Sequence, residues 1–521
     1  MNLVKKFITV ASGTLMSRLF GFVREMLMAA SFGTGPVSDA FNVAFRFPNT
    51  FRRFFAEGAF NAAFVPLFSK KITEDGKEKA CQFAEEVFGV LFSILLLLTI
   101  VMEISMPFLV RTVIAPGFAE DAIKFDATVR FTAIMFPYLT CMSLSAMMGG
   151  MLNALQNYFV AAIAPVFLNI ILIIVLAYAW IYQLDPWHIG LNLSWGVMAA
   201  GIFQLFLIAI ALRKSDIKLY LRFPHFSPNV RQLLTLAFPA AITGGITQIN
   251  LLINTNIASS QPGAVSALVY ADRLYQVPLG VVGIAVATVL LPELTKALRK
   301  KITKTLILYK IVLLNLPYFS PYQHPFFFLL ISSPIVSLLF ERGQFTQEST
   351  SSVAYLLALY GLGLPAFVLI KVFIPSFFAR EDTKTPMIFS AICVFVNVSL
   401  ALTLFPLLSA RGIVIAEITS AWVNTILLYG TLIKRGYWKY DKQLIMWIAR
   451  LIISISLMAS ILYYARDILA VPLSSQTPFL TRATTLAGLV IGTLSIYFTL
   501  CFLLGTNYIT LLRKKLKQSS Q

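Results

Sequence analysis

Charged residues, and acidic ones above all, are scarce in this chain. Only 12% of its 521 residues are charged, and 23 Asp+Glu stand against 42 Lys+Arg. A soluble domain has about 25% charged residues. Because 58% of the residues are apolar, the apolar surface exceeds what a globular core can bury. Most of that surface must therefore face lipid, which predicts an integral membrane protein.

The residue types that build metal sites and disulfide frameworks are also few. The three histidines lie in connecting stretches beside aromatic and proline residues. No cysteine or histidine pair has the spacing of a zinc site or a redox motif. The four cysteines lie far apart in the sequence: Cys81, Cys141, Cys393 and Cys501. We expect no metal site and no catalytic residue.

A nucleotide-binding motif is missing as well. The pair Gly76-Lys77 is followed by Glu78 and lacks the upstream glycine of a P-loop. No soluble stretch is long enough for an ATPase domain. We therefore expect a transporter that is not an enzyme and has no cofactor, driven either by a secondary mechanism or by a separate energising partner. Coupling to Na⁺, to H⁺ or to the membrane potential stays open.

The long apolar segments predict the fold. A spanning helix needs about 20 predominantly apolar residues. The chain offers fourteen such segments, with the ninth interrupted by prolines around 317–328. The predicted fold is an all-α polytopic membrane protein with spans at 7–33, 37–68, 83–110, 127–155, 158–182, 190–212, 232–257, 265–295, 305–340, 350–378, 386–408, 412–433, 444–465 and 483–511.

The basic residues orient these helices. A formal net charge of +19 on a soluble protein would suggest a nucleic-acid partner. Here the loops of one side carry roughly four basic residues for each one on the other side, alternating loop by loop as the positive-inside rule requires. The few on the opposite side include Lys124 and Arg482. This pattern predicts both termini in the cytoplasm and no nucleic-acid partner.

An internal repeat at an offset of about 226–228 residues divides the chain. Val37-Ser38 matches Val265-Ser266, 66–70 (PLFSK) matches 292–296 (PELTK), and Asn169 matches Asn397. The repeat predicts two pseudo-symmetric six-helix lobes that face the same way, which suits alternating access around a central cavity. The predicted parts are an N-lobe at 1–225, a C-lobe at 226–440, and helices 13 and 14 with a basic tail at 441–521.

Charged residues inside the predicted helices mark the candidate site. At the bilayer centre each basic residue costs about 2.5–3.5 kcal/mol, so these side chains must face a hydrated cavity or a partner. The basic members are Arg18, Arg24, Arg46, Arg52, Arg53, Arg273 and Lys371. The acidic members are Glu25, Asp39, Glu57 and Asp272.

Two interpretations of these charges stay open. The residues could form structural ion pairs that hold helices one, two and eight together. Alternatively, the surplus of guanidinium groups could bind a phosphate or pyrophosphate, whose oxygens fit the planar fork of arginine. A polar stripe on helix seven is equally ambiguous between interhelical hydrogen bonds and cavity lining. It consists of Thr243, Thr247, Asn250 and Asn254.

Several motifs resemble those of one transporter family. They are 17–25 (SRLFGFVRE), 38–41 (SDAF), 48–60 (PNTFRRFFAEGAF), 270–274 (YADRL), 339–345 (LFERGQF) and 378–386 (FAREDTKTP). Together they resemble the MurJ (MviN) family of lipid II flippases, and they extend from the first predicted helix to the eleventh. Relatives often have Glu where this chain has Gln276.

The resemblance implies a fold of the multidrug/oligosaccharidyl-lipid/polysaccharide exporter superfamily, with a groove for a lipid tail at helices 13 and 14. It implies transfer of lipid II from the inner to the outer leaflet of a bacterial inner membrane for peptidoglycan synthesis. Membrane lipids and cell-wall synthesis enzymes would be further partners. By position, Arg24, Arg52 and Arg273 match the cavity arginines proposed to hold the pyrophosphate. Arg18, Asp39, Arg53 and Asp272 match other charged positions of the family.

Other cargoes are the alternative. A protein of the same fold could export another lipid-linked oligosaccharide, or drugs and organic cations. A cation site would favour acidic residues, whereas the deep charges here are mostly basic. A membrane scaffold that moves nothing would not require buried arginines.

Overall fold

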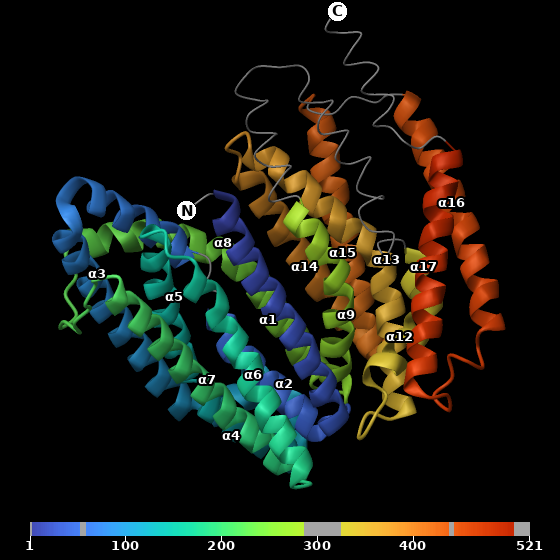
Figure 1. Ribbon diagram of the computed structural model, residues 1–521, viewed down its shortest axis with the longest axis horizontal. Helices are drawn as coiled ribbons and strands as arrows, with labels where there is room; N and C mark the ends of the chain where they lie inside the picture. Colours follow the sequence, from blue (N-terminus) through green and yellow to red (C-terminus); the bar gives the residue numbers. More distant parts are fainter. Residues whose placement is uncertain (1–2, 53–58, 286–324, 437–441, 505–521) are drawn as a thin grey trace, which may run out of the picture. The chain divides into compact units, whose positions relative to one another are not determined.

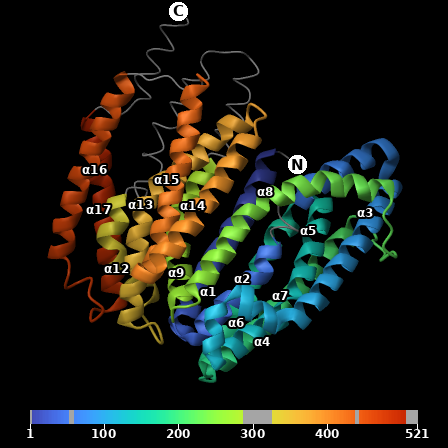
Figure 2. The ribbon, with the colours of Figure 1, turned by 180° about the vertical axis from the view of Figure 1, so that it is seen from behind.

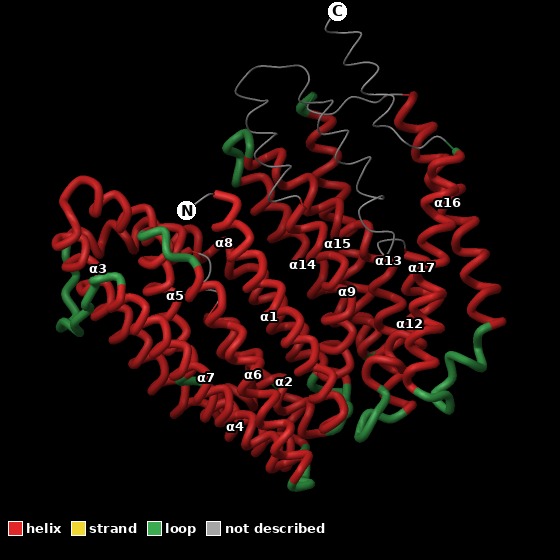
Figure 3. Tube along the Cα trace, viewed as in Figure 1, coloured by secondary structure: helices red, strands yellow, loops and turns green. Residues whose placement is uncertain are grey.

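The computed structural model describes residues 3–52, 59–285, 325–436 and 442–504. In these ranges the chain forms helices joined by short loops, and no strand (Figure 3). Contacts between Cα atoms divide the chain into two compact units. Unit 1 is Met1–Ser266 with Arg342–Phe345, and unit 2 is Ala267–Glu341 with Thr346–Gln521.

Unit 1 is a bundle of eight helices among its described residues (Figure 1). Within it α1 packs against α6, α7 packs against α5 and α6, α2 packs against α4, and α3 packs against α5. The helix α8 also contacts α3, as the reverse view in Figure 2 shows. The bounds are α1 (Leu3–Phe32), α2 (Pro36–Arg52), α3 (Ala59–Leu109), α4 (Ala122–Met135), α5 (Tyr138–Ala154), α6 (Phe159–Ile181), α7 (Pro186–Lys214) and α8 (Pro228–Ala258).

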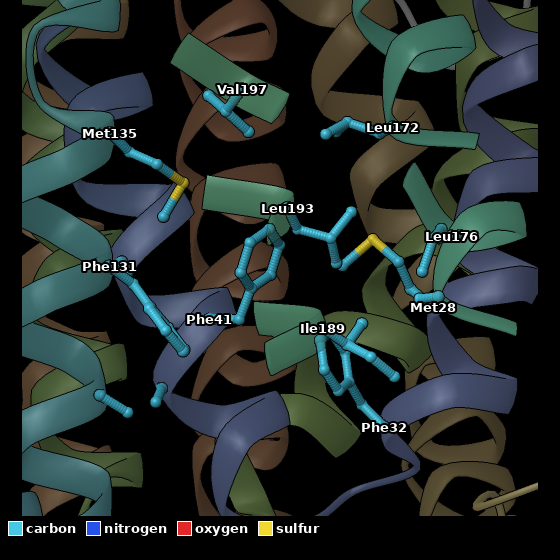
Figure 4. Close-up of a cluster of buried hydrophobic side chains, with 14 of the residues drawn as sticks. Met28, Phe32, Phe41, Phe131, Met135, Leu172, Leu176, Ile189, Leu193 and Val197 are labelled. Carbon is cyan, nitrogen blue, oxygen red and sulfur yellow. The ribbon is translucent and has the colours of Figure 1, made fainter. Parts of the chain in front are cut away.

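A cluster of large apolar side chains holds unit 1 together (Figure 4). Phe41 of α2 lies at its centre and packs edge-on against Phe131 of α4, with ring centroids 6.4 Å apart. Met28 of α1 and Leu193 of α7 close the cluster from their own helices. Side chains from α1, α2, α4, α5, α6 and α7 therefore meet in a packed interior, which fixes the N-terminal part of α2 where Asp39 lies.

Unit 2 contains the remaining described helices (Figure 1). α13 packs against α12 and α15, α14 packs against α15, and α16 packs against α17 and α12. The first three residues of α9 belong to unit 1 by their contacts. The bounds are α9 (Ala264–Ala285), α12 (Pro325–Phe340), α13 (Gln347–Phe378), α14 (Lys384–Leu408), α15 (Ala410–Lys434), α16 (Lys442–Ile468) and α17 (Phe479–Leu503).

Two helix starts follow a simple sequence signal. Asp185 and Ser227 each precede a proline at the first position of α7 and α8, and each side chain accepts a hydrogen bond from a backbone N–H of the first turn. A short polar side chain satisfies N–H groups that a helix leaves open, and proline has the right φ and no N–H to lose there. These caps fix where α7 and α8 begin.

The predicted spans correspond to the helices of the structure. Each of the fourteen segments overlaps a described helix or a consecutive pair, although 286–324 lies outside the described residues. Among the described helices, nine are long and apolar enough to cross a membrane. The prediction of an all-α polytopic membrane protein is confirmed.

The prediction was wrong about the connection between the second and third spans. In place of a loop around 69–82, the helix α3 continues through this stretch and breaks only at Gly76, which has φ +85°. Charged pairs one turn apart, Lys70–Glu74 and Lys71–Asp75, stabilise the helix before the break. The fourth predicted span is also divided, into α4 and α5, at Pro137.

The predicted lobe boundaries at 225/226 and 440/441 stay a prediction. Contacts place α8 with unit 1 and divide the chain after Ser266, whereas the repeat groups α8 with the second lobe. The repeat describes a relation between sequences, and contacts describe packing, so the two divisions need not coincide.

Candidate functional site

Asp39 lies at the centre of a buried polar cluster in unit 1. Its carboxylate is fully enclosed and accepts a hydrogen bond from the Nζ of Lys124 at 3.1 Å. It also accepts from the backbone N–H of Gly263 at 2.8 Å and of Ser266 at 2.9 Å, and from the hydroxyl of Ser266 at 2.7 Å. One carboxylate thereby joins α2, α4 and the turn between α8 and α9. We call these four residues the Asp39 cluster.

The Asp39 cluster brings together equivalent positions of the two copies of the internal repeat. Ser38 and Ser266 are the serines that the repeat places at equivalent positions, and Asn42 donates to both, at 3.4 and 3.3 Å. Asp39 also supplies an acceptor for a free N–H at the start of α9, as a capping residue does within a single helix. The structure therefore gives Asp39 an ion pair with α4 and a cap at the start of α9.

Arg24 is the most buried of the predicted cavity arginines that the structure describes. Its Nη1 donates to the Oδ1 of Asn169 in α6 at 3.0 Å, and its Nη2 forms an ion pair with Glu25 at 2.5 Å. The guanidinium carbon lies 5.7 Å from the ring centre of Phe45. The Nε is buried and makes no hydrogen bond within the protein. Glu25 neutralises this arginine, so it contributes less surplus charge than the sequence suggested.

Arg46 and Arg52 lie on α2 and are half-buried. The Nη1 of Arg46 donates to the Oγ1 of Thr255 in α8 at 2.9 Å. The Nε of Arg52 donates to the Oδ1 of Asn49, one turn earlier, at 3.0 Å. The side chain of Arg18 on α1 is exposed. Arg53 and Glu57 lie outside the described residues.

The remaining predicted site residues lie in unit 2. Arg273 and Lys371 are exposed, and Asp272 is half-buried. The Nε2 of Gln276 donates to Asp272 at 2.5 Å. Because an amide can donate where a carboxylate cannot, Gln276 supplies a neutral partner to Asp272 in place of a second negative charge.

The polar stripe of the seventh predicted helix lies on α8, and the structure describes only part of it. Asn254 is buried and Asn250 is half-buried. The side chains of Thr243 and Thr247 lie outside the described ones. Asn256, on another face of α8, donates to the carbonyl of Val113 at 2.7 Å. Whether the stripe lines a cavity therefore stays a prediction.

Three polar partners were missed by the sequence analysis. Lys124 was assigned to a loop, but it lies in the first turn of α4 and is buried on Asp39. Arg482 was also assigned to a loop, but it is buried in α17. The third is Glu417, which accepts from the hydroxyl of the buried Tyr360 at 2.8 Å. Lys124 and Arg482 were missed because they lie near helix ends, where basic side chains usually extend to the membrane–water interface.

The described part of the site holds buried charges in ion pairs. Among the described residues, no group of three or more His, Cys, Asp or Glu side chains could hold a metal ion. A buried arginine and a buried lysine held in ion pairs within a bundle of apolar spans are typical of a membrane protein that passes a polar cargo. Fold and site together define a multi-pass membrane transporter.

The family follows from comparison with known proteins. Residues 28–481 match the family described as Lipid II flippase MurJ. A probable lipid II flippase MurJ of Rhizobium meliloti is 61% identical over 100% of this chain and 97% of its own length. The lipid II flippase MurJ of Burkholderia cenocepacia is 31% identical over 98% of each chain. The chain belongs to the MurJ family.

Solved structures agree on the fold. A lipid II flippase MurJ in an inward closed conformation matches with a TM-score of 0.78 and 25% identity, over 97% of this chain and 100% of that one. An inward-facing multidrug resistance MATE transporter of the MOP superfamily matches with a TM-score of 0.65 and 16% identity, over 82% and 97%. The second likeness concerns the fold alone.

Proposed function

We propose that this chain is a lipid II flippase that moves the undecaprenyl-pyrophosphate-linked peptidoglycan precursor from the inner to the outer leaflet. The observation that carries the proposal is the likeness over the full chain to relatives named lipid II flippase, at identities up to 61% among those compared. No long insertion or missing part separates the chain from these relatives. The cell-wall precursor is then its cargo, and membrane lipids surround it.

Physical chemistry explains why such a cargo needs a protein. The charged headgroup would otherwise cross about 30 Å of hydrocarbon. A transporter provides a polar route for the headgroup while the tail stays in lipid, along a groove at α16 and α17. Alternating access of two lobes, as in other transporters built from repeats, provides this route without an open channel.

Arg24, Arg52 and Arg273 are the proposed pyrophosphate ligands. Arginine binds phosphate oxygens bidentately and stays charged in a low-dielectric cavity. Asn169 and Glu25 hold the Arg24 guanidinium in one orientation. A ligand oxygen near Nε would complete the hydrogen bonding of this side chain. The supporting charges are Arg18, Glu25, Asp39, Arg53, Glu57 and Asp272.

The Asp39 cluster has a different role in this proposal. It fixes the beginning of α9 to α2 and α4 through four hydrogen bonds to one carboxylate. Because all four bonds end on one carboxylate, a movement of α9 away from α2 would break those from Gly263 and Ser266 together. We assign to the cluster a conformational role, in which the bonds between Asp39 and the beginning of α9 are made in one half of the transport cycle and broken in the other.

Transport is proposed to be of the secondary type, without enzymatic activity and without a cofactor. Coupling to Na⁺, to H⁺ or to the membrane potential stays open. The protein resides in the bacterial inner membrane with both termini in the cytoplasm, as the basic loops indicate. Cell-wall synthesis enzymes are proposed partners.

A second candidate is an exporter of another lipid-linked oligosaccharide or of drugs. The fold shared with a MATE transporter supports this alternative. An organic cation would need acidic groups in the cavity, whereas Glu25 and Asp39 are both held in ion pairs with basic residues. The pairing therefore favours an anionic headgroup.

Complementation of a depleted strain tests the proposal. Bacteria that lose their own lipid II flippase would express the wild-type chain, Arg273→Ala or Arg130→Ala at matched membrane levels. Growth restored by wild type and by Arg130→Ala, but not by Arg273→Ala, is the expected result, since Arg130 is exposed and paired with Asp126. Failure of well-expressed wild type to restore growth would contradict the proposed cargo.

A further inference from the structure

A kink in α12 exposes a backbone carbonyl to its neighbours in unit 2. Pro334 lies inside α12, and Ile331 departs from helical geometry with φ −121°. Because proline has no N–H, the carbonyl of Leu330 loses its partner four residues on. The Nη1 of Arg466 in α16 donates to this carbonyl at 3.3 Å. The end of α16 is thereby attached to α12.

A second arginine contacts α12 seven residues further along the helix. The Nη2 of Arg482 in α17 donates to the hydroxyl of Ser337 at 2.5 Å. Leu330 and Ser337 lie on either side of the kink at Ile331 and Pro334. Arg466 and Arg482, from the two sides of the α16–α17 connection, therefore both contact α12 next to this kink.

Arg482 is buried without a negative partner among the described residues. Its exposed fraction is 8%, and its Nε is buried without a hydrogen bond. The carboxylate of Asp467 forms its ion pair with Arg466, whose Nε and Nη2 both donate to Oδ1. A serine hydroxyl is a neutral acceptor, so no residue in the described ranges compensates the charge of Arg482.

An uncompensated buried charge is expensive. Burial of an ion is tolerated when it is paired and hydrogen-bonded, and is strongly unfavourable otherwise. The first turns of α17 and the end of α16 also expose large apolar side chains, including Phe479, Leu480 and Ile468. A counter-ion at Arg482 is therefore adjacent to a surface that fits acyl chains.

We propose that Arg482 binds the phosphate of an anionic phospholipid, between α12 and α17 and beside Arg466. The phosphate oxygens accept hydrogen bonds from the guanidinium, and the acyl chains cover the exposed apolar residues of α16 and α17. A free phosphate ion has the same oxygens but leaves that apolar surface uncovered. This lipid is a permanent neighbour of the helices and is not the transported cargo.

Thermal unfolding in lipid nanodiscs tests the site. The full chain would be placed in phosphatidylcholine alone or with phosphatidylglycerol, and its unfolding midpoint measured. For wild type, phosphatidylglycerol raises the midpoint by about 3 °C or more, because a ligand of the folded state stabilises it. Arg482→Met loses this rise. In pure phosphatidylcholine, whose phosphate is offset by the choline cation of the same headgroup, the unfolding midpoints of wild type and Arg482→Met differ less than they do with phosphatidylglycerol.

Matched controls separate this site from general surface charge. Arg130→Met removes an exposed arginine and keeps the full rise, whereas Arg482→Lys keeps the charge and retains part of it. An equal rise in wild type and Arg482→Met overturns the proposal, as does no rise in wild type. A rise of the same size with inorganic phosphate in phosphatidylcholine overturns the assignment to a lipid. Because none of these measurements involves transport, their outcome is independent of the proposed flippase activity.

Discussion

The carboxylate of Asp39 accepts hydrogen bonds from both the backbone N–H and the hydroxyl of Ser266, 227 residues further along the chain. The same carboxylate carries an ion pair with Lys124, whose side chain is 5% exposed. The beginning of α9 is thus fixed by a charge that is itself buried. Any change at Asp39 alters the attachment of α9 and the environment of a buried lysine together.

Removal of the Asp39 charge should destabilise the protein strongly. Asp39→Asn leaves the Lys124 ammonium buried and unpaired, and breaking a buried ion pair from one side costs about 3–5 kcal/mol. The double variant Asp39→Asn/Lys124→Met should unfold later than Asp39→Asn alone. Thermal unfolding of the purified protein measures both. Asp126→Asn, which breaks the exposed pair with Arg130, is the control, with an effect of about 0–1 kcal/mol. A double variant less stable than Asp39→Asn would contradict the pairing.

The turn between α8 and α9 requires glycine at Gly263. Its φ is +74°, and an added Cβ would lie 3.0 Å from the carbonyl oxygen of Thr34. The left-handed conformation costs other residues about 1–2 kcal/mol, so Gly263→Ala should lower stability by at least this amount and weaken the bond from its N–H to Asp39. Gly430→Ala is the matched control, because nothing lies near its Cβ position. Equal unfolding midpoints for the two variants would refute the requirement.

Asn169 should matter for transport through its hold on Arg24. Asn169→Ala removes the acceptor of Nη1, and hydrogen bonds to charged groups contribute about 1.5–3 kcal/mol. We expect binding of lipid II to the purified protein to weaken roughly 10-fold or more. Asn157→Ala, at an exposed asparagine, should bind as wild type does. Unchanged binding by a folded Asn169→Ala protein would show that Arg24 needs no support from Asn169.

Low pH should lower the stability of the protein by weakening the contacts of Asp382, which lies between α13 and α14, with Arg435 at the end of α15. The pKa of Asp382 is lowered to about 2, first by the hydrogen bond from Arg435 and then by those from Thr385. An unfolded aspartate titrates near pKa ~3.9. The stabilisation from Asp382 is therefore complete above about pH 4 and is lost as pH falls toward about 2. Unfolding midpoints measured across this range should fall more steeply for wild type than for Asp382→Asn, and parallel curves would contradict the assignment.

The sequence predicted the spans well because hydrophobic length is a local property. The fourteen segments needed no knowledge of packing, and the proline caps of α7 and α8 are visible in the letters themselves. The continuation of α3 through 69–82 was missed because the charged residues there resemble a loop, yet the pairs Lys70–Glu74 and Lys71–Asp75 support a helix.

The polar partners could be predicted only in part. The sequence placed Asp39 among the charged residues inside predicted helices, but its partner Lys124 lies on α4 and its other donors lie beyond residue 260. Which way a lysine near a helix end turns depends on the neighbouring helices and not on the residues beside it. The same holds for Arg482, whose burial depends on the kinked α12.

Lipid II on the outer leaflet, measured in bacteria depleted of their own flippase, tests the central claim most directly. The wild-type chain and Arg130→Ala should restore exposure of lipid II, whereas Arg24→Ala and Arg273→Ala should not, at matched amounts of protein in the membrane. Wild-type protein that reaches the membrane and leaves lipid II on the inner leaflet would contradict the assignment of this cargo.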